Sequence, residues 1–178
     1  RTVSIGSCSP FPISELMPSL QDCLPDKTLL TELVSSDEKL INDLKNHQYD
    51  LVILHTLPED KSLFCQRYME ERIYLSISPD HPFAKKKSIS FKEMLGLRIL
   101  TSQNIGFWMD ITKKHLNESD LLVQGNTDAL IDLIEASSLP SFNSDRILEQ
   151  GIETYGRKNI PISDDDAHAT YWVACRST

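Results

Sequence analysis

The amino-acid sequence predicts an α/β fold, with mixed, mainly parallel sheets flanked by helices. Three observations support this prediction. Short β-branched and apolar runs alternate with segments of helical periodicity in the first third of the chain, and the same alternation restarts after residue 96. A sharp break at Pro79 to Pro82 separates the two halves. With 178 residues, the chain is long enough for one domain or two small lobes.

The first β/α unit begins at the N-terminus. The β-branched run Thr2 to Ile5 predicts a strand, and Gly6 to Pro10 has the composition of a turn. Apolar residues then recur at helical spacing from Ile13 to Leu24, where Pro25 and Asp26 end the helix. Pro18 fits that helix only if it lies in the first turn, because proline lacks the N–H that a helix interior requires.

A second strand, helix and third strand follow. Thr28 to Val34 predicts a strand, and Ser35 to Glu38 has the Ser-x-x-Glu form of a capping box that opens a helix running to about Asn46. The continuous apolar run Leu51 to Leu54 suits a strand covered on both faces. Strands that alternate with helices in this way favour parallel pairing with right-handed crossovers.

The middle of the chain changes character. Ser62 to Met69 and Arg72 to Ser78 predict two further strands. Lys85 to Lys87 is interpreted as a solvated loop, and Phe91 to Leu95 as a short helix. The remaining predicted elements are a strand at Arg98 to Thr101, a helix at Gly106 to Leu116, a strand at Leu121 to Gln124, a helix at Asp128 to Ala136, a short strand at Leu139 to Phe142, a helical turn at Ser144 to Glu149, and strands at Ile160 to Ile162 and Thr170 to Cys175.

Composition excludes several classes of protein. Eighteen Lys and Arg against 26 Asp and Glu give a net charge of -8, which disfavours direct binding of DNA or RNA by this chain. No apolar run approaches the roughly 20 residues that span a bilayer, and no secretion signal is visible. The cysteines form no Cys-x-x-Cys pair, which indicates reduced thiols in a cytoplasmic protein.

No catalytic, metal or cofactor motif has a specific spacing. The five histidines lie far apart in the sequence, so a zinc site has no support from spacing, and Asp164 to Asp166 is interpreted as a solvated turn. Cys8 paired with a distant histidine is a disfavoured nucleophile, because nothing local activates it except a helix N-terminus. We therefore predict no catalytic residue, no metal and no cofactor.

Hydroxyl and amide residues recur where predicted strands end and helices begin. In an open α/β sheet these carboxyl ends of strands line the ligand site, and helix N-termini there favour small anions. The same residue types are also ordinary helix caps, each worth about 1 kcal/mol. The capping box makes Ser35 the expected cap and leaves Ser36 to face a ligand. The clusters are Ser7 and Ser9, Ser35 and Ser36, Thr101 to Gln103, and Asn126 with Thr127.

Several segments, in their order and spacing, resemble the effector-binding domain of LysR-type transcriptional regulators. The resemblance runs from Arg1 to Arg176, and its most recognisable part is Ser78 to Ala84 (SPDHPFA), similar to the family's crossover to the second lobe. The other segments are Arg1 to Gly6, Met17 to Leu20, Leu24 to Asp26, Ser36 to Leu40, Tyr49 to Ile53, and Thr170 to Val173, which is similar to the returning crossover.

The resemblance implies a two-lobed, periplasmic-binding-protein-like (type 2) fold whose lobes are joined by two crossover strands. Residues 1–78 with 168–178 would form lobe I and residues 79–167 lobe II, with a winged helix-turn-helix DNA-binding domain preceding this chain. It also implies a small-molecule effector in the cleft between lobes, a homodimer, and DNA contact only through the preceding domain. By position, the residues matching family sites that line the cleft are Ser7, Ser9, Ser36, Thr101, Ser102 and, more weakly, Thr127.

Two other functions remain open from the sequence. Two-lobed folds of this type also include enzymes, and solute-binding proteins for transport share the architecture.

A small carboxylate or similar anion is the effector that hydroxyls and backbone N–H groups favour. Phe11, Phe107 and Trp108 lie beside these loops and would equally suit an aromatic effector.

Overall fold

The structure is a computed structural model that describes residues 1–151 and 156–178. The chain forms two compact units, each assembled from separate parts of the sequence. Unit 1 contains Arg1–Glu70, Asn104–Asp110 and Thr170–Thr178, and unit 2 contains Glu71–Gln103 and Ile111–Ala169. None of the described helices is both long and apolar enough to cross a membrane.

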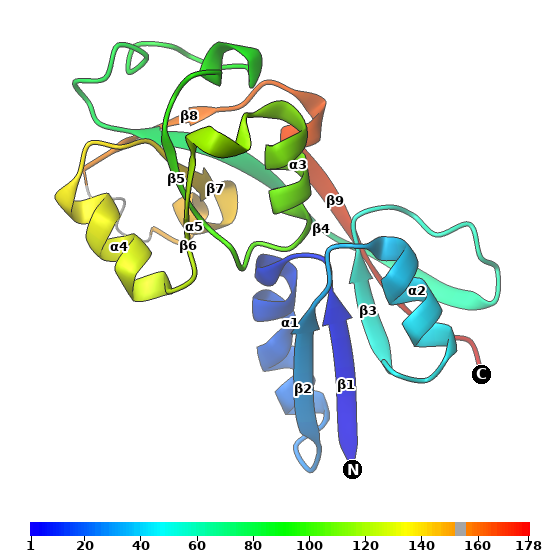
Figure 1. The fold of residues 1–178 in the computed structure, drawn as a ribbon. Helices are drawn as coiled ribbons and strands as arrows, with labels where there is room; N and C mark the ends of the chain where they lie inside the picture. Colours follow the sequence, from blue (N-terminus) through cyan, green and yellow to red (C-terminus); the bar gives the residue numbers. More distant parts are fainter. Residues whose placement is uncertain (152–155) are drawn as a thin grey trace. The chain divides into compact units, whose positions relative to one another are not determined.

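The sheet of unit 1 has the order β2-β1-β3-β9 (Figure 1). Strand β1 (Thr2–Ser7) pairs in parallel with β2 (Thr28–Leu33) on one side and with β3 (Leu51–Leu54) on the other. Strand β9 (His168–Arg176) runs antiparallel to β3. The carboxyl ends of β1, β2 and β3 therefore meet at one edge of this sheet, as the predicted alternation of strands and helices requires.

Helix α1 (Pro10–Cys23) follows β1 and begins three residues before its first predicted apolar position, Ile13. Pro18 therefore lies inside the helix and not in its first turn, which corrects the expectation from the sequence. The proline nitrogen cannot donate to the carbonyl of Ser14 one turn earlier. Buried Pro12 and Ile13 fix the start of the helix, so tertiary packing outweighs this lost hydrogen bond.

Helix α2 (Asp37–Lys45) packs its apolar face into unit 1 through Leu40 and Leu44, which are fully buried. Its C-terminal end is held by Arg176, whose guanidinium donates to the carbonyls of Leu44 and Tyr49 at 2.6 and 2.7 Å. A cation at this end of a helix satisfies carbonyls that lack an intrahelical partner. The phenol of Tyr49 donates to Glu32 at 2.5 Å, and its burial beside that carboxylate raises the pKa of Tyr49.

Unit 2 has a second sheet, built on the part of β4 (Leu63–Ile77) that follows Arg72. Strands β7 (Ser141–Ser144) and β8 (Lys158–Pro161) each run antiparallel to β4. Strand β5 (Ile99–Ser102) runs parallel to β7 and to β6 (Leu121–Gln124). The predicted strand at Leu121 to Gln124 is confirmed to the residue.

The two strands predicted at Ser62 to Met69 and Arg72 to Ser78 are one continuous strand, β4, so that prediction is wrong. Glu70 and Glu71 lie between the two predicted strands, and Glu71 is buried with its carboxylate accepting a hydrogen bond from the hydroxyl of Ser144 at 2.6 Å. Because a hydrogen-bonded carboxylate is tolerated inside a protein, the strand continues through a position that the sequence pattern disfavours.

Helices α3 (Phe107–His115), α4 (Thr127–Ala136) and α5 (Asp145–Glu149) occur within a residue or two of the predicted positions. The short helix predicted at Phe91 to Leu95 is a single turn of 3-10 helix, η1 (Lys92–Met94). Two further turns of this type are η2 (Glu118–Asp120) and η3 (Asp165–Ala167). The core of unit 2 contains Leu75, Ile77, Ala84, Ile89, Phe91, Met94, Ile99, Leu116, Leu121, Ile160, Ile162 and Ala167.

The acidic run Asp164 to Asp166, interpreted from the sequence as a solvated turn, contains two carboxylates that hold unit 2 together. Asp164 accepts a hydrogen bond from the N–H of Phe91 at 2.8 Å. Asp166 contacts Lys114 at 2.9 Å and His115 at 2.6 Å. These hydrogen bonds lower the pKa of Asp166, so the carboxylate is the form that the folded unit stabilises.

Candidate functional site

Ser7 and Ser9 lie in the turn that joins β1 to α1, and both are buried. The hydroxyl of Ser7 donates to the carbonyl of Ser9 at 2.7 Å and accepts from its N–H at 3.3 Å. Ser9 is the N-cap residue of α1, but its hydroxyl makes no capping hydrogen bond. Among the residues that the structure describes, Ser9 Oγ is one of two buried side-chain polar atoms without a hydrogen-bond partner. A buried hydroxyl without a partner is available to a ligand.

Ser36, and not Ser35, is the N-cap of α2, which corrects the predicted capping box. Its hydroxyl accepts a hydrogen bond from the N–H of Lys39 at 3.2 Å. The helix starts one residue later than predicted because the side chain of Asp37, its first residue, is held elsewhere. The hydroxyl of Ser36 is exposed and keeps its proton available for a second acceptor.

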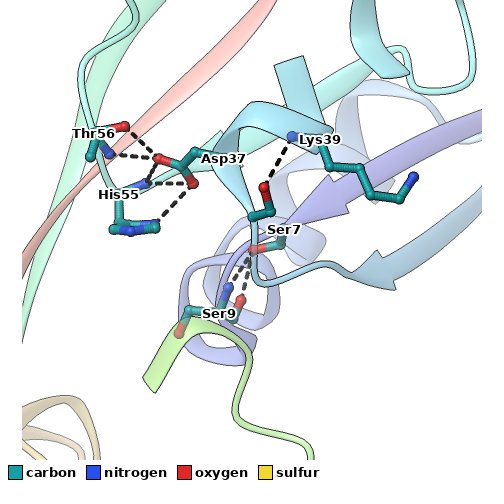
Figure 2. A network of polar contacts seen from close by, with 7 residues as sticks. Ser7, Ser9, Asp37, Lys39, His55 and Thr56 are labelled. Carbon is teal, nitrogen blue, oxygen red and sulfur yellow. Dashed lines mark hydrogen bonds and ion pairs between the residues drawn. The ribbon is translucent and has the colours of Figure 1, made fainter. Parts of the chain in front are cut away.

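A network that sequence reasoning missed surrounds Asp37 at the start of α2 (Figure 2). Its Oδ2 accepts hydrogen bonds from the N–H of Thr56 at 2.9 Å, the hydroxyl of Thr56 at 2.6 Å and the N–H of His55 at 3.1 Å. Its Oδ1 lies 2.9 Å from Nδ1 of the His55 ring. Asp37 therefore ties the start of α2 to the loop that follows β3.

The imidazole of His55 is held from a second direction by the first turn of α3. The ring of Phe107 stacks on it with centroids 4.0 Å apart and an interplanar angle of 6°. Phe107 is fixed in turn, because its N–H donates to the carbonyl of Cys8 at 2.8 Å. Phe107 and Trp108 are nearly buried within unit 1, so packing accounts for both rings and the aromatic-effector alternative gains no support from them.

In unit 2, the predicted residues lie at the carboxyl ends of two adjacent parallel strands. Thr101 and Ser102 are the last residues of β5, and Ser102 is in register with Gln124, which ends β6. Thr101 is buried and its hydroxyl is 3.5 Å from the carbonyl of Ser102, a long hydrogen bond. Thr127 is exposed at the start of α4.

Asn126 caps α4, because its side-chain oxygen accepts from the N–H of Ala129 at 3.1 Å. Each unit thus brings its predicted residues together at one sheet edge: Ser7, Ser9 and Ser36 in unit 1, and Thr101, Ser102 and Thr127 in unit 2. Both sets lie beside helix N-termini, whose partial positive charge favours anions, although Pro10 and Pro12 reduce the number of free N–H groups at the start of α1.

Comparison with known proteins places the chain in a family. The model of the LysR substrate binding domain matches residues 2–178. The chain belongs to this family. None of the curated protein sequences compared with the chain matches it. The family assignment confirms the resemblance inferred from the sequence, and the domain is the regulatory part of a LysR-type transcription regulator, a class of protein that is not enzymatic.

Solved structures of LysR-family regulators show the same fold. The regulatory domain of MetR from N. meningitidis has a TM-score of 0.74 at 20% identity, covering 99% of this chain and 86% of that one. The reduced OxyR regulatory domain from Pseudomonas aeruginosa has a TM-score of 0.68 at 15% identity, covering 99% and 87%. The effector binding domain of BenM with its effector benzoate has a TM-score of 0.64 at 17% identity, covering 99% and 84%.

Full-length LysR-family proteins extend beyond the region that this chain matches. The chain covers 62% of full-length BenM, with a TM-score of 0.67 and 17% identity. The predicted periplasmic-binding-protein-like (type 2) fold is confirmed by the family match and these structures together. This LysR domain therefore has the architecture that places ligand-binding residues at strand ends.

Proposed function

We propose that this LysR domain binds a small carboxylate or similar small anion as its effector, and that binding controls transcription by the full-length protein. Ser7, Ser9 and Ser36 of unit 1 and Thr101, Ser102 and Thr127 of unit 2 supply the ligand contacts. The observation that carries the proposal is the Ser9 hydroxyl, which is buried at the N-terminus of α1 without a hydrogen-bond partner among the described residues. An anion accepting from it would also lie at the positive end of α1, where Phe11 and Ile13 still offer N–H groups although Pro10 and Pro12 have none.

The test is thermal unfolding of the chain with a panel of small carboxylates, inorganic anions, amino acids and aromatic acids. A ligand at 100 times its dissociation constant stabilises by about 2.7 kcal/mol, which raises the midpoint of a chain of this size by roughly 5 to 10 °C. We expect such a shift with one class of anion and its loss in Ser9→Ala. Aromatic acids alone shifting the midpoint would contradict the small-anion proposal.

Ser9→Ala is a sharper variant than Ser36→Ala for this purpose. The Ser36 hydroxyl caps α2, so its removal costs about 1 kcal/mol whether or not a ligand binds. The Ser9 hydroxyl makes no cap, so the unliganded midpoint should stay nearly unchanged. Ser14→Ala serves as the matched control, because Ser14 is exposed on the same helix and donates only to the carbonyl of Pro10. The control should keep the full ligand shift.

We further propose that the domain forms a homodimer, and that the full-length protein is cytoplasmic and contacts DNA through an N-terminal winged helix-turn-helix. Support for the dimer comes from β2, an edge strand of the unit 1 sheet. On this strand Leu30 is 56% exposed and Leu33 39% exposed. Exposed apolar side chains on an edge strand are a surface that a second copy would cover.

Replacing Leu30 with Glu should shift the domain from dimer to monomer in sedimentation equilibrium. The introduced carboxylate would need to be desolvated in the interface, which weakens association by at least about tenfold. Leu57→Glu is the matched control, since Leu57 is 60% exposed in the loop after β3 and should leave the association constant unchanged. A monomeric wild-type domain, or an equal effect of both substitutions, would argue against a dimer through β2.

A further inference from the structure

Cys8, Asp37 and His55 lie together in unit 1. One possible ligand atom from each residue is within 4.8 Å of the others. Cys8 follows β1, Asp37 follows β2 as the first residue of α2, and His55 follows β3. Since these three strands are parallel neighbours, their carboxyl ends bring together a thiol, a carboxylate and an imidazole that are far apart in the sequence.

Each of the three residues is held in place by further contacts. The N–H of Cys8 donates to the carbonyl of Ile53 at 3.0 Å, and its carbonyl accepts from Phe107. The Oδ2 atom of Asp37 accepts the closer hydrogen bonds from His55 and Thr56, while Oδ1 accepts only a long one from the N–H of His55 at 3.4 Å and lies beside the imidazole. Stacking on Phe107 fixes the plane of the His55 ring. Contacts of this kind orient metal ligands in known sites.

The imidazole of His55 is close to the carboxylate of Asp37 but makes no hydrogen bond to it. Nδ1 of His55 is buried and lies 2.9 Å from Oδ1 of Asp37, but it does not have the geometry of a hydrogen bond. Together with Ser9 Oγ, it is one of two such buried atoms in the described part of the chain. A cation bound to both atoms would satisfy a nitrogen that has a charged neighbour but no hydrogen bond among the described residues.

We propose that Cys8, Asp37 and His55 form a three-ligand site for Zn²⁺. Sulfur, nitrogen and carboxylate oxygen are the ligand types that zinc combines, whereas Mg²⁺ and Ca²⁺ select oxygen alone. Zn²⁺ takes the place of the thiol proton of Cys8, which is released to solvent. The two negative ligands then balance the charge of the ion. The fourth position is left to water or another small ligand, as in zinc sites with three protein ligands.

The dimensions of the cluster are compatible with this site. Zinc bonds of about 2.0 to 2.3 Å in tetrahedral geometry place ligand atoms roughly 3.3 to 3.8 Å apart. The ligand atoms lie within 4.8 Å of one another, with 2.9 Å between His55 Nδ1 and Asp37 Oδ1, so binding an ion requires them to move by about an ångström. The thiol of Cys8 is fully buried, which suits a ligand better than a nucleophile that must reach a substrate. The His55 side chain is 26% exposed and provides the route by which an ion enters.

This site goes beyond the proposed effector function and does not depend on it. All three ligands belong to unit 1, so the site needs no residue from unit 2. Neither the family assignment nor the names of the related structures point to a metal at these positions.

The experiment is a titration of the reduced, chelator-treated chain with Co²⁺, followed by displacement with Zn²⁺. We expect one Co²⁺ per chain, a thiolate-to-cobalt charge-transfer band, tetrahedral d–d absorption, and loss of these bands with one equivalent of Zn²⁺. Cys8→Ser and His55→Gln should remove the charge-transfer band or weaken binding by more than about 100-fold. Thr56→Val, which removes only a donor to Asp37, should weaken binding by about 10- to 100-fold.

Matched controls separate this site from adventitious binding. Cys23→Ser and His47→Gln change an exposed thiol and an exposed imidazole of the same unit, and both should bind Co²⁺ as the wild type does. Circular dichroism of each metal-free variant reports whether it folds, and His55→Gln decides the question if the buried Cys8→Ser variant does not fold. A wild-type chain that binds no Co²⁺ overturns the proposal. So does a charge-transfer band that survives in folded Cys8→Ser.

Discussion

Gly106→Ala is expected to destabilise unit 1 by about 2 to 5 kcal/mol. Gly106 has a φ of +61°, a left-handed conformation that costs a residue with a side chain about 1 to 2 kcal/mol. A Cβ added there would lie 2.0 Å from the carbonyl oxygen of Cys8, far closer than two non-bonded heavy atoms can approach. The segment must move away, which breaks the hydrogen bond from Phe107 to Cys8 and leaves a buried carbonyl unpaired.

Denaturant unfolding of Gly106→Ala measures the loss of stability. Faster hydrogen exchange of the Phe107 amide shows whether its hydrogen bond to Cys8 is broken. Gly96→Ala is the matched control, because Gly96 has a φ of +87° but no atom within 4 Å of an added Cβ. The control should lose only the stability of about 1 to 2 kcal/mol that a left-handed backbone costs alanine. The difference between the two variants therefore isolates the close approach of Gly106 to Cys8. Equal losses in both would show that the segment accommodates the methyl group without separating from the turn.

The same contact explains what the sequence could not predict about the candidate site. Hydroxyl residues at strand ends, such as Ser7 and Thr101, follow from local patterns of apolar runs and turn residues, and the structure places them where the parallel strands end. The sequence pattern assigns Gly106 to the start of a helix, but nothing near it in the sequence indicates that it must lie against Cys8. Such a close approach is a property of chain segments that are distant in sequence.

The first residue of α2 also could not be predicted from the local sequence. Ser35 has the better local capping motif, since Glu38 follows it at the spacing of a capping box. The carboxylate of Asp37 is instead held by donors of His55 and Thr56, 18 and 19 residues later in the chain. These contacts fix Asp37 as the first helical residue and make Ser36 the cap. Local propensity predicts the helix, and tertiary hydrogen bonds select its first residue.

One arginine in each unit holds the C-terminal end of a helix, a role that its position in the sequence does not indicate. Arg176 holds the C-terminal end of α2 through the carbonyls of Leu44 and Tyr49. Arg157 has the corresponding role for α4 in unit 2 and makes four hydrogen bonds to backbone carbonyls. The acceptors are Ser76 at 3.1 Å, Ile134 at 3.3 Å, Ser137 at 3.1 Å and Leu139 at 2.7 Å. Each guanidinium thus satisfies carbonyls at a helix end that faces away from the proposed ligand contacts.

Arg157→Leu is expected to lower the free energy of unfolding of unit 2 by at least about 3 kcal/mol, because several partly buried carbonyls lose a charged donor at once. Burial lowers the pKa of Arg157, but a guanidinium remains charged at neutral pH, so the donors are present throughout that range. Arg157→Lys should recover only part of the loss, since one ammonium group cannot reproduce the planar fork that reaches β4, α4 and the loop after it.

Denaturant unfolding with hydrogen exchange tests this prediction, and the pattern of exchange is as informative as the total. Amides of α4 should exchange faster in Arg157→Leu than those of the strand β5, because the helix end is anchored by Arg157 whereas the strand is held by its neighbours β6 and β7. Arg98→Leu is the matched control, since Arg98 is exposed in the same unit and its loss should change stability by less than about 0.5 kcal/mol. Equal effects of the two substitutions would mean that the four carbonyls find water in place of Arg157, and that the end of α4 is held by apolar packing alone.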